Sequence, residues 1–259
     1  MLDCSKLRVL ITGAASGLGA ALAKAFASRG AKVWLTDIRE ERLREVHATL
    51  TSETRGAIRS IAGDLAEASF IADLAQKVQA EDGWVDILIN NAALIRPGRI
   101  GHTAAAAWEE VLKVNLLAPC LLLNELATAM NEHSQAPLVV NISSVAALQG
   151  APYEASYVVS KAGLQGLSAA VNEEYSMFGR IRAMTVCPGN METEIWRHTE
   201  GWPGISRTPR DRLMKPDTVA EAIARWVEMS DELDLSQCVL TPRKDLQDAD
   251  NLVNPKFKE

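Results

Sequence analysis

The feature that most constrains this chain is a glycine-rich turn near its start. The segment from Thr12 to Gly19 reads TGAASGLG, and it joins an apolar stretch to an alanine-rich amphipathic stretch. Glycines there allow a tight turn, a close approach of the backbone to a ligand, and packing of a helix against a strand. The following helix N-terminus supplies N–H donors and a positive dipole end. This unit predicts a parallel sheet with a dinucleotide site beside its first strand.

The rest of the chain alternates short apolar runs with longer helical periods. Nearly all-apolar strands separated by helices are typical of a parallel sheet buried on both faces. We therefore expect one Rossmann domain over residues 1–259, a doubly wound α/β sheet with helices on both faces. The predicted strands cover 7–12, 32–36, 57–62, 86–89, 138–142, 182–186 and 237–240. The predicted helices cover 17–29, 40–50, 67–81, 104–132 with a bend near Pro119, 156–177 and 217–229.

Composition excludes several classes of protein. The formal net charge is −6, which argues against a nucleic-acid partner because such surfaces carry a basic excess. The four cysteines and four histidines are scattered, so no metal site is expected. No signal peptide is recognisable, and the apolar stretch from Val111 to Met130 is interrupted by polar residues. We expect no membrane span and a cytoplasmic location.

A carboxylate at the end of the second strand bears on the cofactor. Asp37 can accept hydrogen bonds from the adenosine ribose hydroxyls and repels a 2′-phosphate. The loop residues Ala14 to Ser16 and Ile38 offer no basic group to such a phosphate, although Arg39 lies close by. The sequence therefore predicts NAD, with NADP less favoured.

A second group of polar residues indicates acid/base chemistry. Tyr157 precedes Lys161 by four residues, so both lie on one face of a predicted helix. A neighbouring ammonium stabilises a phenolate, and we expect Lys161 to lower the pKa of Tyr157. Ser144 follows the fifth strand, Asn91 follows the fourth, and Asn115 lies on a long helix. The carboxyl ends of parallel strands form the ligand crevice, where such groups collect.

These motifs, in this order and spacing, closely resemble the classical short-chain dehydrogenase/reductase family over residues 5 to 230. The resemblance implies that Tyr157 is the acid/base and that Ser144, rather than Ser143, binds the substrate oxygen. Lys161 would bind the nicotinamide ribose, and Asn115 would hold a water that links Lys161 to solvent. Asp64 would contact the adenine and Thr193 the carboxamide. The implied cofactor-binding residues are Gly13, Ser16, Gly17, Leu18, Gly19, Asp37, Asp64, Leu65, Asn91, Ala92, Tyr157, Lys161, Pro188, Gly189 and Thr193.

Two departures from the family pattern are visible. Ala93 replaces a usual glycine, and the C-terminal segment lacks the common glycine-rich ending. Residues 190–215 are predicted to form a substrate-binding lid, and 242–259 a polar tail. The predicted substrate-pocket residues are Leu94, Gln149, Tyr153, Trp196 and Trp202. The two tryptophans favour an apolar or ring-shaped substrate, or else they only pack the lid down.

The expected activity is an NAD-dependent interconversion of a secondary alcohol and a ketone, with a small hydroxy or keto compound as substrate. Two other functions stay open at this point. One is an epimerase or dehydratase that uses NAD transiently, and the other is a non-catalytic, redox-sensing NAD-binding protein. The helices at 104–132 and 156–177 are apolar on more than one face. The resemblance implies that they pair between subunits in a homotetramer or homodimer.

Overall fold

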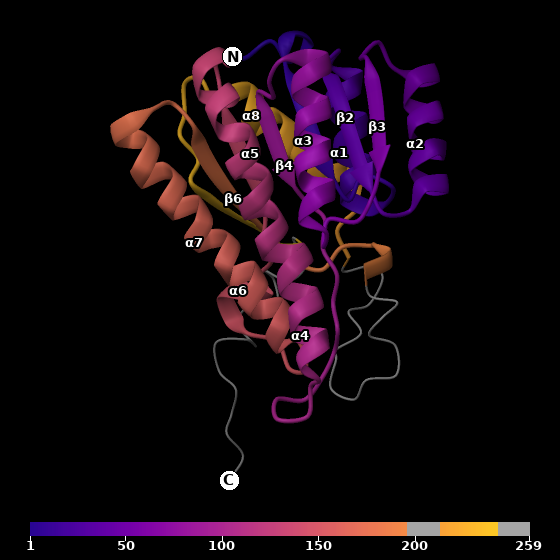
Figure 1. Ribbon diagram of the computed structural model, residues 1–259, viewed down its shortest axis with the longest axis vertical. Helices are drawn as coiled ribbons and strands as arrows, with labels where there is room; N and C mark the ends of the chain where they lie inside the picture. Colours follow the sequence, from indigo (N-terminus) through magenta and orange to yellow (C-terminus); the bar gives the residue numbers. More distant parts are fainter. Residues whose placement is uncertain (196–212, 243–259) are drawn as a thin grey trace.

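The computed structural model describes residues 1–195 and 213–242, and one parallel sheet organises them (Figure 1). Its strand order is β3-β2-β1-β4-β5-β6-β7, with every neighbouring pair parallel. The doubly wound fold predicted from the sequence is thus confirmed. The strands are β1 (Arg8–Thr12), β2 (Lys32–Asp37), β3 (Ile58–Ala62), β4 (Ile87–Asn90), β5 (Leu138–Ile142), β6 (Arg182–Pro188) and β7 (Gln237–Leu240).

Helices cover both faces of this sheet, as expected. One apolar cluster joins the sheet to α1 (Gly17–Ser28), α2 (Glu40–Glu53) and α8 (Pro216–Met229). A second cluster joins the other face to α3 (Ala68–Asp82), α5 (Ala118–His133) and α7 (Ala155–Phe178). The remaining elements are short: the 3-10 turn η1 (Cys4–Lys6), α4 (Ala105–Leu112), the π-helical turn η2 (Lys113–Leu117) and α6 (Ala146–Gln149).

The first strand shows why the strands are apolar throughout. Val9 and Ile11 belong to the cluster on the α1 face, whereas Leu10 belongs to the cluster on the α3 face. All three side chains are fully buried. Successive residues of a strand point to opposite faces of the sheet. Because helices cover both faces here, the strand residues are apolar throughout and do not alternate between apolar and polar.

The order of the strands creates the crevice that positions the site. β1 lies between β2, which precedes β3 in the chain, and β4, which leads on to β5. The chain therefore winds in opposite directions from β1, and the loops after β1 and β4 diverge. In such sheets the ligand binds outside the carboxyl ends of the strands at this point. The glycine turn follows β1, and Asn91 follows β4.

The helix predicted over 104–132 is interrupted close to Pro119, in agreement with the predicted break or bend there. The irregular turn is η2, and Pro119 lies in the first turn of α5. Proline is tolerated there because the first helical N–H groups have no partner in any case. The stretch Ala105–His133 is long and apolar enough to span a membrane by composition alone. Its side chains Leu122, Leu126 and Met130 are nevertheless buried against the sheet.

The predicted lid and tail fall partly outside the described residues. At the base of the lid, Met191 pairs with Met214, and the Glu192 amide donates to the Met214 carbonyl at 3.0 Å. The two ends of the lid segment are thus joined beside β6. Trp196, Trp202 and residues 243–259 of the tail lie outside the described residues.

Candidate functional site

The glycine turn forms a cradle in which the glycine positions disfavour any side chain. Gly13 and Gly17 have φ of +66° and +53°, a region that L-residues rarely adopt. A Cβ at Gly13 would lie 2.8 Å from Cα of Ala92, and one at Gly19 would lie 2.1 Å from the Gly13 carbonyl oxygen. The backbone here is therefore free to face a ligand, with the N-terminus of α1 directly behind it. A dinucleotide phosphate fits this donor set.

Two polar side chains fasten the cradle to the end of β4. The hydroxyl of Thr12 accepts the amides of Asn91 and Ala92, each at 3.0 Å. The Asn91 amide group donates to the carbonyls of Thr12 at 2.9 Å and Gly13 at 3.2 Å. Asn91 therefore ties the loop after β4 to the glycine turn.

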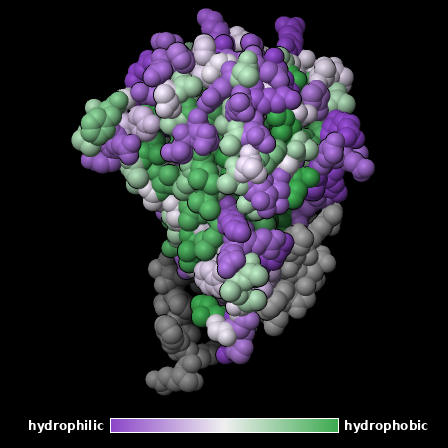
Figure 2. Space-filling view, viewed as in Figure 1, coloured by the Kyte–Doolittle hydropathy of each residue, from purple (hydrophilic) through white to green (hydrophobic). Residues whose placement is uncertain are grey.

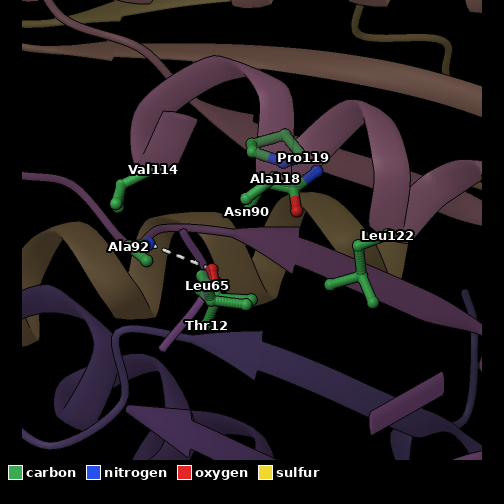
Figure 3. A pocket seen from close by; sticks show the side chains of 8 residues that line it. All are labelled: Thr12, Leu65, Asn90, Ala92, Val114, Ala118, Pro119 and Leu122. Carbon is green, nitrogen blue, oxygen red and sulfur yellow. Dashed lines mark hydrogen bonds between the residues drawn. The ribbon is translucent and has the colours of Figure 1, made fainter. Parts of the chain in front are cut away.

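A small pocket lies beside this junction, and the Thr12–Ala92 hydrogen bond runs along it (Figure 3). Two of the predicted cofactor residues, Leu65 and Ala92, line it together with side chains that the sequence did not single out. The full lining is Thr12, Leu65, Asn90, Ala92, Val114, Ala118, Pro119 and Leu122. The loop after β3 and the start of α5 thus meet at the crevice.

Asp37 is buried at the tip of β2 and is held by several donors. The Ala15 amide donates to it at 3.1 Å, and the Arg39 guanidinium contacts both carboxylate oxygens at 3.0 Å. Burial acts to raise the pKa of Asp37, but the hydrogen bonds from Arg39 and Ala15 outweigh it and hold the pKa below its usual value. Asp37 is therefore an anion, as a ribose acceptor must be.

Arg39 extends from this carboxylate across the mouth of the crevice. It donates to the hydroxyl of Ser16 at 2.9 Å and to Glu194 at 3.3 Å. Glu194, which follows β6, also pairs with Arg42 of α2. Two arginines and two carboxylates thus form one cluster at the tip of β2. The sequence pointed to Asp37 and Arg39, but not to Glu194 opposite them.

Tyr157 and Lys161 lie one turn apart on α7, and both are buried. Burial raises the pKa of Tyr157 to about 12, although a hydrogen bond with Ser144 acts to lower it. Burial also lowers the pKa of Lys161 to about 7. The Lys161 ammonium nitrogen lies 5.8 Å from the centre of the phenol ring and donates to the Ile142 carbonyl at 2.7 Å. The expected lowering of the Tyr157 pKa by Lys161 is therefore not seen, because desolvation dominates both groups.

The two serines after β5 face different neighbours. The Ser143 hydroxyl is buried and donates to the Lys161 carbonyl at 2.8 Å, which ties the strand end to α7. Ser144 is only partly buried and interacts with the Tyr157 hydroxyl. The Val145 amide donates to the Pro188 carbonyl at 3.0 Å, so the end of β6 holds this turn in place. The Ser144 hydroxyl thus lies at the Tyr157 hydroxyl, whereas the Ser143 hydroxyl is bonded to the backbone of α7.

Asn115 lies at the centre of the π-helical turn η2 and is fully buried. Its Oδ1 accepts the Leu94 amide at 2.8 Å, and its Nδ2 donates to the Leu94 carbonyl at 2.9 Å and the Ser160 hydroxyl at 3.1 Å. Single π-turns of this kind are frequent at functional sites. Asn115 therefore fixes the loop after β4 to α7, next to Lys161.

A row of buried polar groups beneath the site was missed at the sequence level. Asn90 donates to Asn141 at 2.8 Å, and both Asn141 at 2.9 Å and Thr185 at 2.7 Å donate to Ser168 of α7. The three strand residues are in register across β4, β5 and β6. The available signal was a lone polar residue in each apolar strand, and buried polar residues need such partners.

The other predicted residues are placed as follows. Thr193 contacts the glycine turn, since a Cβ at Gly17 would lie 3.2 Å from its methyl carbon. Asp64 accepts the Ala66 amide at 2.8 Å and so holds its own turn. Gln149 is exposed, and Tyr153 has a strained φ of +64°. Among the described residues no cluster of potential metal ligands is found.

Comparisons with known proteins agree with this geometry. A family model described as short chain dehydrogenase matches residues 7–203. D-threitol dehydrogenase of Mycolicibacterium smegmatis is 33% identical over 217 residues, 82% of each protein. The 3-oxoacyl-acyl-carrier-protein reductase of Thermotoga maritima is 33% identical over 224 residues, 83% of this chain and 87% of the relative. The crystal structure of a metagenomic short-chain oxidoreductase in complex with NADP has a TM-score of 0.78 at 30% identity, covering 93% of this chain and 99% of the other.

Proposed function

Because this chain belongs to the short-chain dehydrogenase/reductase family, we propose that it interconverts a secondary alcohol and a ketone, with Tyr157 as the general acid/base. The observation that carries this proposal is the buried Tyr157, with Ser144 at its hydroxyl and Lys161 one turn further on. All three lie on elements that meet at the carboxyl edge of the sheet. A redox sensor would not need this pair, whereas an epimerase or dehydratase would use the same acid/base but usually carries a larger substrate domain.

The state of Tyr157 indicates how the proton moves. With a pKa of about 12, the phenol is protonated at neutral pH, so it donates its proton to a ketone oxygen as that oxygen becomes an alkoxide. Ser144 donates a hydrogen bond to the same oxygen and holds it in place. In the reverse direction Tyr157 must first lose its proton, so alcohol oxidation should accelerate as the pH rises.

The glycine cradle has the shape and donors of a dinucleotide site, and the residues present fit a nicotinamide cofactor. The diphosphate would lie over Gly13, Ser16, Gly17, Leu18 and Gly19, with the rest of the cofactor along the loops after β4 and β6. When bound, the cofactor supplies the hydride carrier and, in its oxidised form, a positive ring. The loops after β4 and β6 contribute Asn91, Ala92, Pro188, Gly189 and Thr193.

We propose NAD as the preferred cofactor, with a modest preference over NADP. Asp37 presents an anion at the ribose position, which favours two free hydroxyls and repels a phosphate. Arg39 offsets part of that repulsion because it already neutralises Asp37 and reaches Ser16. The metagenomic relative was crystallised with NADP, so both cofactors must be compared directly.

The substrate is proposed to be a small hydroxy or keto compound. Leu94 and Tyr153 are described residues proposed to line the pocket, and Trp196 and Trp202, also proposed, lie outside the described residues. The relatives named above act on different compounds, a sugar alcohol and an acyl thioester by their names. These names support the reaction type and leave the substrate to be found.

A homotetramer or homodimer also stays a proposal, as does a cytoplasmic location. Hydrophobic residues gather over the face formed by α5 and α7 (Figure 2). Leu117 and Val159, on η2 and α7, are each 49% exposed. Association of these helices between subunits would remove that apolar surface from water. A single-chain mass in light scattering would contradict this assembly.

The function is tested first by binding and then by turnover. Tryptophan fluorescence titrations with NADH and NADPH measure the two dissociation constants. A panel of ketones with NADH, and of secondary alcohols with NAD, is then followed in the nicotinamide absorbance. Turnover of at least one ketone with saturable NADH binding is expected. Absence of both NADH and NADPH binding would contradict the proposal.

A further inference from the structure

Glu154 is a buried carboxylate that the mechanism above does not use. It lies immediately before α7, one turn ahead of Tyr157, and its residue surface is only 4% exposed. It is the N-cap residue of α7, but its side chain makes no cap hydrogen bond, and among residues 1–195 and 213–242 its carboxyl has no hydrogen bond or ion pair. Buried carboxylates are ordinarily paired, because desolvation of an unpaired charge is costly. A helix cap or a structural ion pair therefore does not explain this residue.

The position of Glu154 is fixed from two sides. Its backbone forms a parallel bridge with Gly98 of the loop after β4, and the Gly98 amide donates to the Tyr153 carbonyl at 2.8 Å. The neighbouring Tyr153 adopts a φ of +64°, a conformation that is found where the surroundings enforce it. The chain is thus held in a strained turn that delivers Glu154 to the start of α7.

Glu154 lies at the same end of α7 as the reacting hydroxyl. It is the N-cap residue, and Tyr157 follows it by three residues in the first turn of the helix. In agreement, the charge of Glu154 raises the pKa of Tyr157. Burial raises the pKa of Glu154 itself. An acceptor that has no hydrogen bond within the described residues therefore lies at the end of α7 that carries Tyr157.

We propose that Glu154 determines substrate specificity by accepting a hydrogen bond from a second hydroxyl of the substrate, next to the reacting carbon. This inference rests on the proposed alcohol–ketone chemistry and names its substrate class: neutral hydroxyketones and the matching polyols. A hydroxyl bound there satisfies the buried acceptor, whereas an apolar substrate leaves it unpaired. An anionic keto acid would meet like charge in a desolvated site.

The test compares butanone with acetoin, which differ by one hydroxyl beside the carbonyl. We expect the protein to reduce acetoin with the higher kcat/KM. In Glu154→Gln this preference for acetoin should fall by about tenfold or more, mainly through KM, because a charge-assisted hydrogen bond is lost. The relative rate on α-ketobutyrate should rise in the same variant, because the like charge is gone.

Two further variants separate specificity from folding. Glu173→Gln makes the same change at an exposed position of α7 and should leave the acetoin preference unaltered. Glu154→Asp keeps the charge and should retain part of the preference. Thermal melting of each variant shows whether it folds, and the Asp variant carries the test if the Gln variant does not.

The outcomes distinguish the two proposals. If the protein reduces both ketones and Glu154→Gln leaves their ratio unchanged, the role of Glu154 is wrong while the alcohol–ketone chemistry stands. An equal loss on both ketones would likewise contradict a specificity role. If the protein reduces no ketone with either NADH or NADPH, the proposed function fails, and the role of Glu154 fails with it.

Discussion

The two halves of the crevice are built by different means. On the β1–β2 side the site consists mainly of backbone. Side chains are disfavoured at Gly13, Gly17 and Gly19, so the backbone of the turn would contact the cofactor. On the β4–β6 side the site is side chains: Tyr157 and Lys161 are buried, with polar groups beneath and beside them. The cofactor-binding half depends on glycines that have no side chain, whereas the catalytic half depends on buried polar side chains.

This difference has an energetic meaning. Glycine loses more backbone freedom on folding than other residues, so the cradle costs conformational entropy. The catalytic half instead costs desolvation, which appears as the raised pKa of Tyr157 and the lowered pKa of Lys161. Cofactor binding and chemistry should therefore fail separately, each through its own kind of substitution.

The largest effect is expected on the side-chain half. Tyr157→Phe should lower ketone reduction by about 10²- to 10⁴-fold, because the proton donor is removed. NADH affinity, measured by fluorescence titration, should stay close to that of the parent protein. Tyr175→Phe removes a hydroxyl from the same helix further from the site and serves as the control. Full turnover in Tyr157→Phe would remove this residue from the acid/base role.

The next effect falls on the backbone half. Gly19→Ala forces a Cβ toward the Gly13 carbonyl oxygen, 2.1 Å away, so the cradle must deform. NADH affinity should weaken about ten- to hundredfold, through lost backbone hydrogen bonds to the phosphates. Gly166→Ala is the matched control, because a Cβ there meets open space within α7. That change should stabilise the fold by about 0.5–1 kcal/mol. Unchanged NADH binding in Gly19→Ala would contradict the cradle.

A smaller change, in cofactor preference, is expected at Asp37, at the edge of the cofactor-binding half. Asp37→Ala removes the carboxylate and frees Arg39, so the ratio of NADP to NAD affinity should rise by about tenfold. Asp73→Ala, at an exposed position of α3, controls for the loss of one negative charge. Titration of both variants with NADH and NADPH measures the ratio. A ratio that Asp37→Ala leaves unchanged would show that Asp37 does not select the cofactor.

The smallest effect is a dependence of stability on pH. The pKa of Lys161 is about 7 in the folded protein, below its ordinary value, so the unfolded chain holds this proton to higher pH. The buried charge therefore opposes folding fully below about pH 7, and this penalty fades as the pH rises. Lys161→Met should unfold at higher urea concentration than the parent protein in acid, with the difference shrinking toward alkaline pH. A difference that grows with pH would contradict the buried charge.

Much of this molecule could be read from the sequence because its signals are local. The glycine turn, the apolar strands and the Tyr157–Lys161 pair each depend on neighbours within a few residues. The predicted strands at 138–142 and 237–240 coincide with β5 and β7. The interruption near Pro119 was predicted, but its π-helical form was not, because nothing local in the sequence marks a π-turn.

What only the tertiary structure decided are contacts between segments far apart in the chain. The row from Asn90 through Asn141 to Ser168 exists because three strands align in register beneath α7. Arg39 meets Glu194 across 155 positions, and Glu154 becomes buried when the loop after β4 closes over it. Local spacing determined which residues could perform the chemistry. Burial, which depends on the whole fold, set their pKa values and left the Glu154 carboxyl without a hydrogen bond among the residues that the structure describes.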